Sequence, residues 1–171
     1  MRTHEEGARN VNHQTPVDMS SFESALDSVC TSRVWQQGIL AASPYADADA
    51  VYAASDRAVA ALGADDVLEA LAGHPRIGER AAPGHSEWSA AEQAGMSSAG
   101  DDLAQRMRTA NVAYEQRFDK VYLVCATGLS AEELLERLQE RLGNDDGTED
   151  RVTRTELAKI NRLRLRKLFE N

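Results

Sequence analysis

The sequence has few cysteines and no long apolar run. Its 171 residues include only two cysteines, Cys30 and Cys125, which lie far apart along the chain. No stretch approaches the ~18 apolar residues that a membrane-spanning helix requires, and the first residues lack the apolar segment of a secretory signal. We therefore expect both thiols to be reduced and the protein to act in the cytoplasm, away from the membrane.

Positive charge is also scarce. The chain has 19 basic and 28 acidic residues and a formal net charge of −9 at pH 7, which repels a phosphate backbone or an anionic membrane surface. The one basic cluster, RLRLRKL near the end of the sequence, interleaves arginine with leucine at helical spacing. This pattern favours an amphipathic final helix with a solvated basic face, so we expect neither nucleic acid nor membrane as a partner.

Signals for β-structure are missing. No two runs of alternating β-branched or aromatic residues are joined by a hairpin turn, and aromatic residues make up only 5% of the chain. Apolar residues recur instead at steps of three and four, which predicts an all-α fold, a single-domain bundle of about eight helices. Residues 1–18 are polar and without periodicity and are expected to form a disordered leader, followed by a helical domain over residues 19–171.

Caps and helix breakers predict the helix boundaries. Ser20 with Glu23, and Ser130 with Glu133, have the spacing of capping boxes, and glycines follow several of the periodic segments. The apolar run 121–125 is compatible with either a buried helix or a short strand. The other helices are expected over residues 21–30, 34–40, 47–62, 65–72, 98–118, 130–142 and 148–169.

Common metal and nucleotide motifs are absent. His74 and His85 are eleven residues apart with a proline between them, and no cysteine pair has ligand spacing, so no metal site is expected. The glycines from residue 73 to residue 84 lack the lysine and serine of a phosphate-binding loop. Cys125 lies in the most apolar run of the chain, which favours a small buried hydrophobic residue over a nucleophile.

The candidate chemistry lies in LAGHPRIGERAAPGHSEWSAAEQAGM, residues 71–96. His74 follows Gly73 and precedes Pro75, so its backbone is extended at a helix end and its imidazole projects from a stiff corner. Such a histidine suits proton transfer near neutral pH. The alternative is a C-cap histidine that bonds the last carbonyls of the helix, and the local sequence leaves both interpretations open.

The second half of this stretch adds three polar side chains. Ser89 and Glu92 have capping-box spacing, and Gln93 follows directly. In one interpretation these residues only begin a helix. In the other, their hydroxyl, carboxylate and amide lie beside the free backbone N–H groups of the helix start. The second arrangement is suited to a polar anionic ligand.

Five motifs in this order resemble the OHCU decarboxylase family, named for 2-oxo-4-hydroxy-4-carboxy-5-ureidoimidazoline. They are HPRIGE, WSAAEQAG, NVAYEQRF, LVCATGLSAEELLERLQERLGND and the pattern E..KI..LRL, and the resemblance covers residues 19–169. It implies an all-helical homodimer that converts OHCU to (S)-allantoin and carbon dioxide in urate degradation. It also implies that no cofactor is used, because the C=N bond beside the reacting carbon can accept the electrons that decarboxylation releases.

The resemblance implies roles for individual residues. His74 is expected to be the catalytic histidine beside the leaving carboxylate, and Glu92 the catalytic glutamate that holds this histidine or the ureido N–H groups. Arg164 is expected to bind a carboxylate or urea oxygen with its forked guanidinium, with Arg162 and Arg166 as neighbouring alternatives. The remaining substrate-binding residues are expected to be Ser89, Gln93, Pro75, Val124 and Cys125, with backbone groups of the segment 123–126 included.

Some positions depart from the family pattern. Arg76 and Ile77 stand where many relatives have an acidic residue and leucine, which we interpret as a bacterial variant. Asp119 stands where glycine is common. Neither change removes a group with an expected role in catalysis.

Two other functions are compatible with the sequence. One is a helical binding or scaffold protein in which residues 71–96 form only a capped loop between helices. The other is a related ureide-pathway enzyme that acts on a different anionic substrate. An enzyme site requires His74, Glu92, Gln93 and Arg164 to converge within about 10 Å, and a scaffold has no such requirement.

Overall fold

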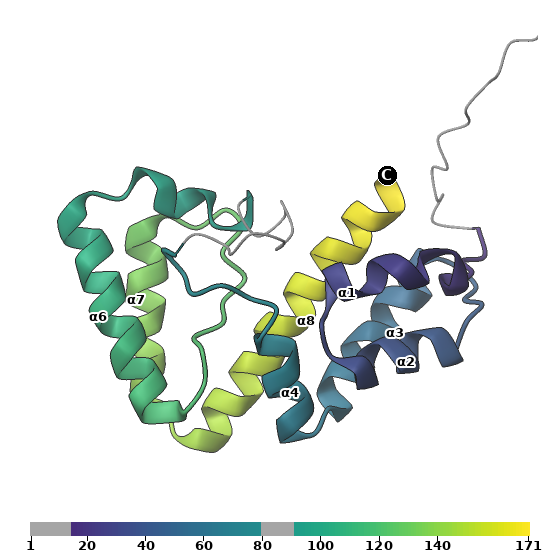
Figure 1. Cartoon of the computed structure of the whole chain (residues 1–171), viewed down its shortest axis with the longest axis horizontal. Coiled ribbons are helices and arrows are strands. Elements are labelled where there is room, and N and C mark those ends of the chain that lie inside the picture. The colour runs from purple at the N-terminus through teal and green to yellow at the C-terminus, as the bar shows by residue number, and fades with distance from the viewer. Residues whose placement is uncertain (1–14, 80–90) are drawn as a thin grey trace, which may run out of the picture.

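The computed structural model describes residues 15–79 and 91–171, and the structural statements below refer to these residues. They form seven α-helices, two 3₁₀ helices and one isolated β-bridge (Figure 1). The all-α prediction is confirmed, and the expected number of helices was close. In chain order the elements are η1 (Met19–Ala25), α1 (Leu26–Val29), α2 (Arg33–Ala41), α3 (Ala48–Ala61), α4 (Ala64–Leu71), η2 (Ala94–Ser98), α6 (Asp101–Phe118), α7 (Ala131–Leu142) and α8 (Asp146–Glu170).

Side-chain caps begin several of these helices. At α7 the predicted capping box is confirmed: Ser130 Oγ accepts from the N–H of Glu133 at 3.1 Å, and the Glu133 carboxylate accepts from the N–H of Ser130 at 2.8 Å. α3 and α8 begin after Asp47 and Asp145, whose carboxylates accept backbone N–H groups of the first turn. These bonds satisfy amides that have no partner within the helix, so the start of each helix is determined locally.

The beginning of the fold differs from the prediction. Val17 pairs with Tyr45 through two backbone hydrogen bonds of 2.9 and 2.8 Å and is only 3% exposed. The predicted box at Ser20 is wrong, because the Asp18 carboxylate accepts from the Ser20 N–H and begins η1. The expected leader over residues 1–18 falls mostly on residues 1–14, which lie outside the described residues, whereas Val17 and Asp18 make the contacts given above.

The long helix α8 runs across the molecule and packs against helices on both of its sides (Figure 1). On one side it contacts α1 and α3. The core of this side includes Leu26, Trp35, Ile39, Val51, Leu157 and Leu165. On the other side α6 and α7 pack together, and their core includes Met107, Tyr114, Tyr122, Leu134 and Leu138. We refer to these as the first core and the second core.

A buried ion pair closes the second core. Arg141 of α7 and Glu149 of α8 are 7% and 0% exposed, and Arg141 Nε and Nη2 donate to one oxygen of Glu149 at 2.8 and 2.5 Å. The hydroxyl of Tyr114 donates to the same oxygen, and Asn144 donates to the other at 3.0 Å. Burial alone raises the pKa of Glu149, but the hydrogen bonds from these three donors outweigh it and hold the pKa below its ordinary value. Side chains of α6, α7 and α8 thus meet at one carboxylate.

The apolar run 121–125 is neither a helix nor a strand, so both alternatives drawn from the sequence were wrong. The segment has no regular secondary structure, and side chains bond to its backbone. Arg141 Nη1 donates to the carbonyl of Leu123 at 2.5 Å, and the N–H of Cys125 donates to Glu156 at 2.8 Å. Because buried backbone groups require partners, these two side chains replace the neighbouring strand that the segment lacks.

Asp119 ends α6 in the left-handed region, with φ 53° and ψ 34°. Glycine adopts this conformation without strain, and aspartate is among the residues that tolerate it best. The geometry explains why a glycine is common at this position and why aspartate can replace it.

Candidate functional site

The turn that carries His74 begins directly at the end of α4. The backbone N–H of His74 donates to the carbonyl of Leu71 at 3.0 Å. A Cβ atom at Gly73 would lie 2.6 Å from Cγ2 of Thr31. Thr31 in turn donates from Oγ1 to the carbonyl of Glu69 at 2.8 Å. Only glycine allows this close approach, which fixes the position from which His74 leaves the helix.

A small cavity of about 20 Å³ lies where this turn meets the segment 122–126 and α8. Nε2 of His74 is buried. Five of the residues predicted from the sequence line the cavity, as do Leu123 and Ala126 of the predicted segment 123–126. Ile77, Tyr122 and Ile160 were not predicted. The lining consists of His74, Pro75, Ile77, Glu92, Gln93, Tyr122, Leu123, Val124, Ala126 and Ile160. An imidazole, a carboxylate and an amide therefore share one largely apolar space.

Arg164 forms a bidentate ion pair with Glu92. Nε and Nη2 of Arg164 each lie 2.9 Å from a different oxygen of the Glu92 carboxylate. The two residues are 3% and 9% exposed. Arg164 Nη1 also lies 3.4 and 3.3 Å from the carbonyls of Ser28 and Val29, which accept its hydrogen bonds. The forked geometry orients both groups, and α8 and α1 together hold the guanidinium beside the cavity.

The two neighbouring arginines lie elsewhere. Arg162 pairs with Asp56 at 2.5 Å and stacks over the ring of Tyr52, with 5.6 Å from its guanidinium carbon to the ring centroid. Arg166 is exposed. Among the three arginines of this motif, the structure therefore brings Arg164 to Glu92.

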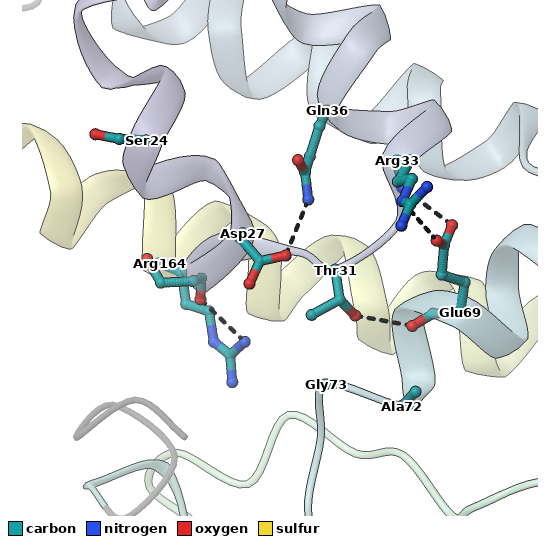
Figure 2. A pocket seen from close by; sticks show the side chains of 10 residues that line it. Ser24, Asp27, Thr31, Arg33, Gln36, Glu69, Ala72, Gly73 and Arg164 are labelled. Carbon is teal, nitrogen blue, oxygen red and sulfur yellow. Dashed lines mark hydrogen bonds and ion pairs between the residues drawn. The ribbon is translucent and has the colours of Figure 1, made fainter. Parts of the chain in front are cut away.

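Arg164 lines a larger pocket of about 700 Å³ (Figure 2). This pocket was not predicted, because its residues other than Arg164 come from η1, α1, α2, α4 and the turns beside these helices and show no motif. Arg164 lines this pocket while it binds Glu92, which lines the small cavity, so the two spaces adjoin at the ion pair. The other lining residues are Ser24, Asp27, Ser28, Thr31, Arg33, Gln36, Glu69, Ala72 and Gly73.

Gln93 bonds to the turn that follows His74. Its Oε1 accepts from the N–H of Gly78 at 3.0 Å, and its Nε2 donates to the carbonyl of Arg76 at 3.4 Å. Gly78 has φ +88°, in the region that favours glycine. The sequence did not predict these contacts, because nothing in the spacing of Gln93 indicates a partner fifteen residues earlier.

Two predicted residues, Ser89 and Cys125, are not in the described lining of the cavity. Ser89 lies outside the described residues, and so does His85. Cys125 is absent from the described lining, and its side chain packs against the first core. Burial raises the pKa of the Cys125 thiol, and the carboxylate of Glu156 raises it further. The roles expected for Ser89 and Cys125 stay predictions.

Across the part of the chain that the structure describes, no three His, Cys, Asp or Glu side chains come together in a way that could hold a metal ion. No helix within residues 15–79 or 91–171 has both the length and the apolar character needed to cross a bilayer.

Comparison with known proteins gives a consistent match. A family model described as OHCU decarboxylase matches residues 16–166. The chain is 29% identical over 147 residues to the uric acid degradation bifunctional protein TTL of Arabidopsis thaliana, which covers 83% of this chain and 45% of that protein. It is 40% identical over 80 residues to a 2-oxo-4-hydroxy-4-carboxy-5-ureidoimidazoline decarboxylase of Amia calva, which covers 46% of this chain and 45% of that protein. The matches span less than half the length of these two curated relatives.

One solved structure matches over almost its whole length. It is a crystal structure of OHCU decarboxylase in the presence of (S)-allantoin. Its sequence is 26% identical to this one, the TM-score is 0.74, and the match covers 86% of this chain and 98% of that chain.

Proposed function

The chain belongs to the OHCU decarboxylase family, and on this premise we propose that it converts OHCU to (S)-allantoin and carbon dioxide without a cofactor. One observation carries the proposal: His74, Glu92 and Gln93 line one cavity, and Arg164 is bound to Glu92. A scaffold protein has no requirement for this convergence.

The reaction needs proton transfer and orientation more than it needs an electron sink. When the bond to the carboxylate breaks, its electron pair forms a new C=C bond, and the electrons of the adjacent C=N bond move to nitrogen, which takes up a proton. The hydroxyl group then loses its proton as it becomes a carbonyl, and the carbon that bears the ureido group gains one. Delivery of this proton to one face determines the hand of the product.

The residues divide these tasks in the following way. His74 transfers protons beside the leaving carboxylate, where its imidazole is presented from the stiff turn at Pro75. Glu92, oriented by Arg164, accepts hydrogen bonds from the ureido N–H groups, and the guanidinium binds a carboxylate or urea oxygen. Ser89, Gln93, Val124 and Cys125 belong to the same proposal as hydrogen-bonding partners through side-chain or backbone groups.

The direct test follows product chirality. OHCU is generated in situ from urate, and the formation of allantoin is recorded by circular dichroism with and without the protein. We expect the protein to accelerate the signal and to enrich the S form. An unchanged rate together with a racemic product would exclude the decarboxylase activity.

His74→Ala tests the catalytic assignment. Removal of a proton-transfer group is expected to lower kcat by about 100-fold or more, with an unchanged unfolding midpoint. His13→Ala, in the polar leader expected from the sequence, is the matched control and should retain full activity. Near-normal turnover of His74→Ala would remove this residue from its role.

We also propose that the protein is a homodimer, as the family resemblance implies. Analytical ultracentrifugation at micromolar concentration tests the assembly directly. A sedimentation coefficient that corresponds to 18.7 kDa across the whole concentration range would contradict it.

A further inference from the structure

Asn111 and Glu115 lie one helical turn apart on α6, within the NVAYEQRF motif, and both contact the turn that follows His74. We infer that these two residues are positioning residues, which hold residues 76–78 and thereby fix the direction of the His74 imidazole. The inference rests on the proposed function and gives the NVAYEQRF motif a role in it.

The contact made by Asn111 is buried. Its Nδ2 donates to the carbonyl of Ile77 at 3.0 Å, and the two residues are 4% and 5% exposed. A buried carbonyl without a partner is costly, so this hydrogen bond selects one conformation of the turn. Ile77 also lines the cavity, and the bond therefore acts on its wall directly.

The contact made by Glu115 is more exposed. Its carboxylate oxygens accept from Nε and Nη2 of Arg76 at 2.5 and 3.0 Å. The side chains of Arg76 and Glu115 are 44% and 26% exposed. Water screens a pair of this kind, so its contribution is smaller than that of the buried bond from Asn111. Its forked geometry nevertheless determines where the side chain of Arg76 lies.

Gln93, from a different part of the chain, also bonds to the backbone of residues 76–78. It bonds the N–H of Gly78 and the carbonyl of Arg76, the residues on either side of Ile77. Backbone groups of three consecutive residues are thus bonded by side chains from α6 and from Gln93. Gly78 also has little room, since an added Cβ would lie 3.3 Å from Cε of Met96.

Only Pro75 separates this held turn from His74. The proline ring restricts its own φ angle, and the residue before a proline is restricted as well. On the other side, the N–H of His74 is bonded to the end of α4. His74 therefore lies between two anchored points with few free dihedral angles, and a loosened turn changes the direction of its imidazole.

Three variants test the inference. Asn111→Asp keeps the shape but places a carboxylate oxygen against the Ile77 carbonyl, and Glu115→Gln removes the charge that binds Arg76. Glu136→Gln, the same carboxylate-to-amide change at an exposed residue of α7, is the matched control. Kinetics on OHCU give kcat and KM separately, and amide hydrogen exchange at Gly78 reports the turn without reference to activity.

A misplaced catalytic group lowers kcat more than it weakens binding. We expect Asn111→Asp to lower kcat by about 10-fold to 100-fold with KM changed by less than about 3-fold. The exchange rate of the Gly78 amide should rise in the same variant. Glu115→Gln should lower kcat by about 3-fold, consistent with a screened pair. The double variant Arg76→Glu with Glu115→Arg exchanges the two charges and should have a kcat close to that of the unaltered chain. If Glu115→Gln lowered kcat only through a general loss of stability, the double variant would not recover it.

Unchanged kcat and unchanged exchange at Gly78 in both variants would overturn the inference. Failure of the double exchange to restore kcat would overturn the part that concerns Glu115. If Asn111→Asp does not fold, the kcat values of Glu115→Gln and of the double exchange test the inference. Should the unaltered chain not decarboxylate OHCU, the proposed function fails, and faster exchange at Gly78 in the variants would still show that α6 holds the turn.

Discussion

The two cores on either side of α8 are stabilised by different interactions. The first core is filled mainly by apolar side chains, and its largest fully buried members include Trp35, Ile39, Leu157 and Leu165. The second core is smaller and contains the Arg141–Glu149 pair. An apolar core depends on volume and shape, whereas a buried ion pair depends on the presence of both partners. The second core also contains Tyr122, Val124 and Ala126, three residues that line the cavity, so its polar contacts bear directly on the cavity.

Breaking the buried pair should have the largest effect on stability. Glu149→Leu leaves the Arg141 guanidinium buried without its carboxylate, and we expect a loss of about 3–5 kcal/mol in the free energy of unfolding. Urea denaturation measures the loss. The double variant Arg141→Met with Glu149→Leu should lose less than the sum of the two single variants. Strict additivity would show that the two charges do not act together.

A cavity in the first core should cost somewhat less. Leu157 is 0% exposed, and Leu157→Ala is expected to lower the free energy of unfolding by about 3 kcal/mol. Because Arg141 and Glu156, and not Leu157, bond the backbone of the segment 122–126, the activity per folded molecule should stay close to normal. A loss of activity as large as that of a variant in the second core would show that the two cores affect the cavity equally.

Acid should weaken the second core selectively. The folded-state pKa of Glu149 lies below its ordinary value of 4.5. Its contribution to stability is therefore complete above pH 4.5 and is lost as the pH falls through the folded-state pKa. Urea midpoints across this range should fall steeply for the unaltered chain and for Leu157→Ala, and less steeply for Glu149→Gln. An equal slope in Glu149→Gln would assign the acid sensitivity to other carboxylates.

The two cysteines give the smallest and most local readout. Burial raises the pKa of both the Cys30 and the Cys125 thiols, so alkylation at neutral pH should be slow at both. Cys30 is 1% exposed and belongs to the first core, whereas Cys125 is only partly buried. In mild urea Cys125 should react first, and Cys30 only on global unfolding. Equal rates would indicate that the two thiols become accessible in the same opening event.

The sequence predicted the helices better than it predicted the site. Ser130 and Glu133 are three residues apart and bond each other's backbone, so local spacing was sufficient at α7. At η1 the same spacing was misleading, because Asp18 competed for the Ser20 N–H. The run 121–125 could not be assigned, since its backbone partners Arg141 and Glu156 come from later in the chain.

The order of motifs in the sequence was enough to indicate the family and to make His74 and Glu92 candidates, with an arginine of the last helix, because residue identity and spacing are properties of the chain itself. Only the tertiary structure decided that Arg164, and not Arg162 or Arg166, meets Glu92. It also showed that side chains from α6 and Gln93 hold the turn beside His74. The physical reason is the same in both cases. These contacts join residues far apart in sequence, and their partners are determined by how helices pack across α8 and not by any local pattern.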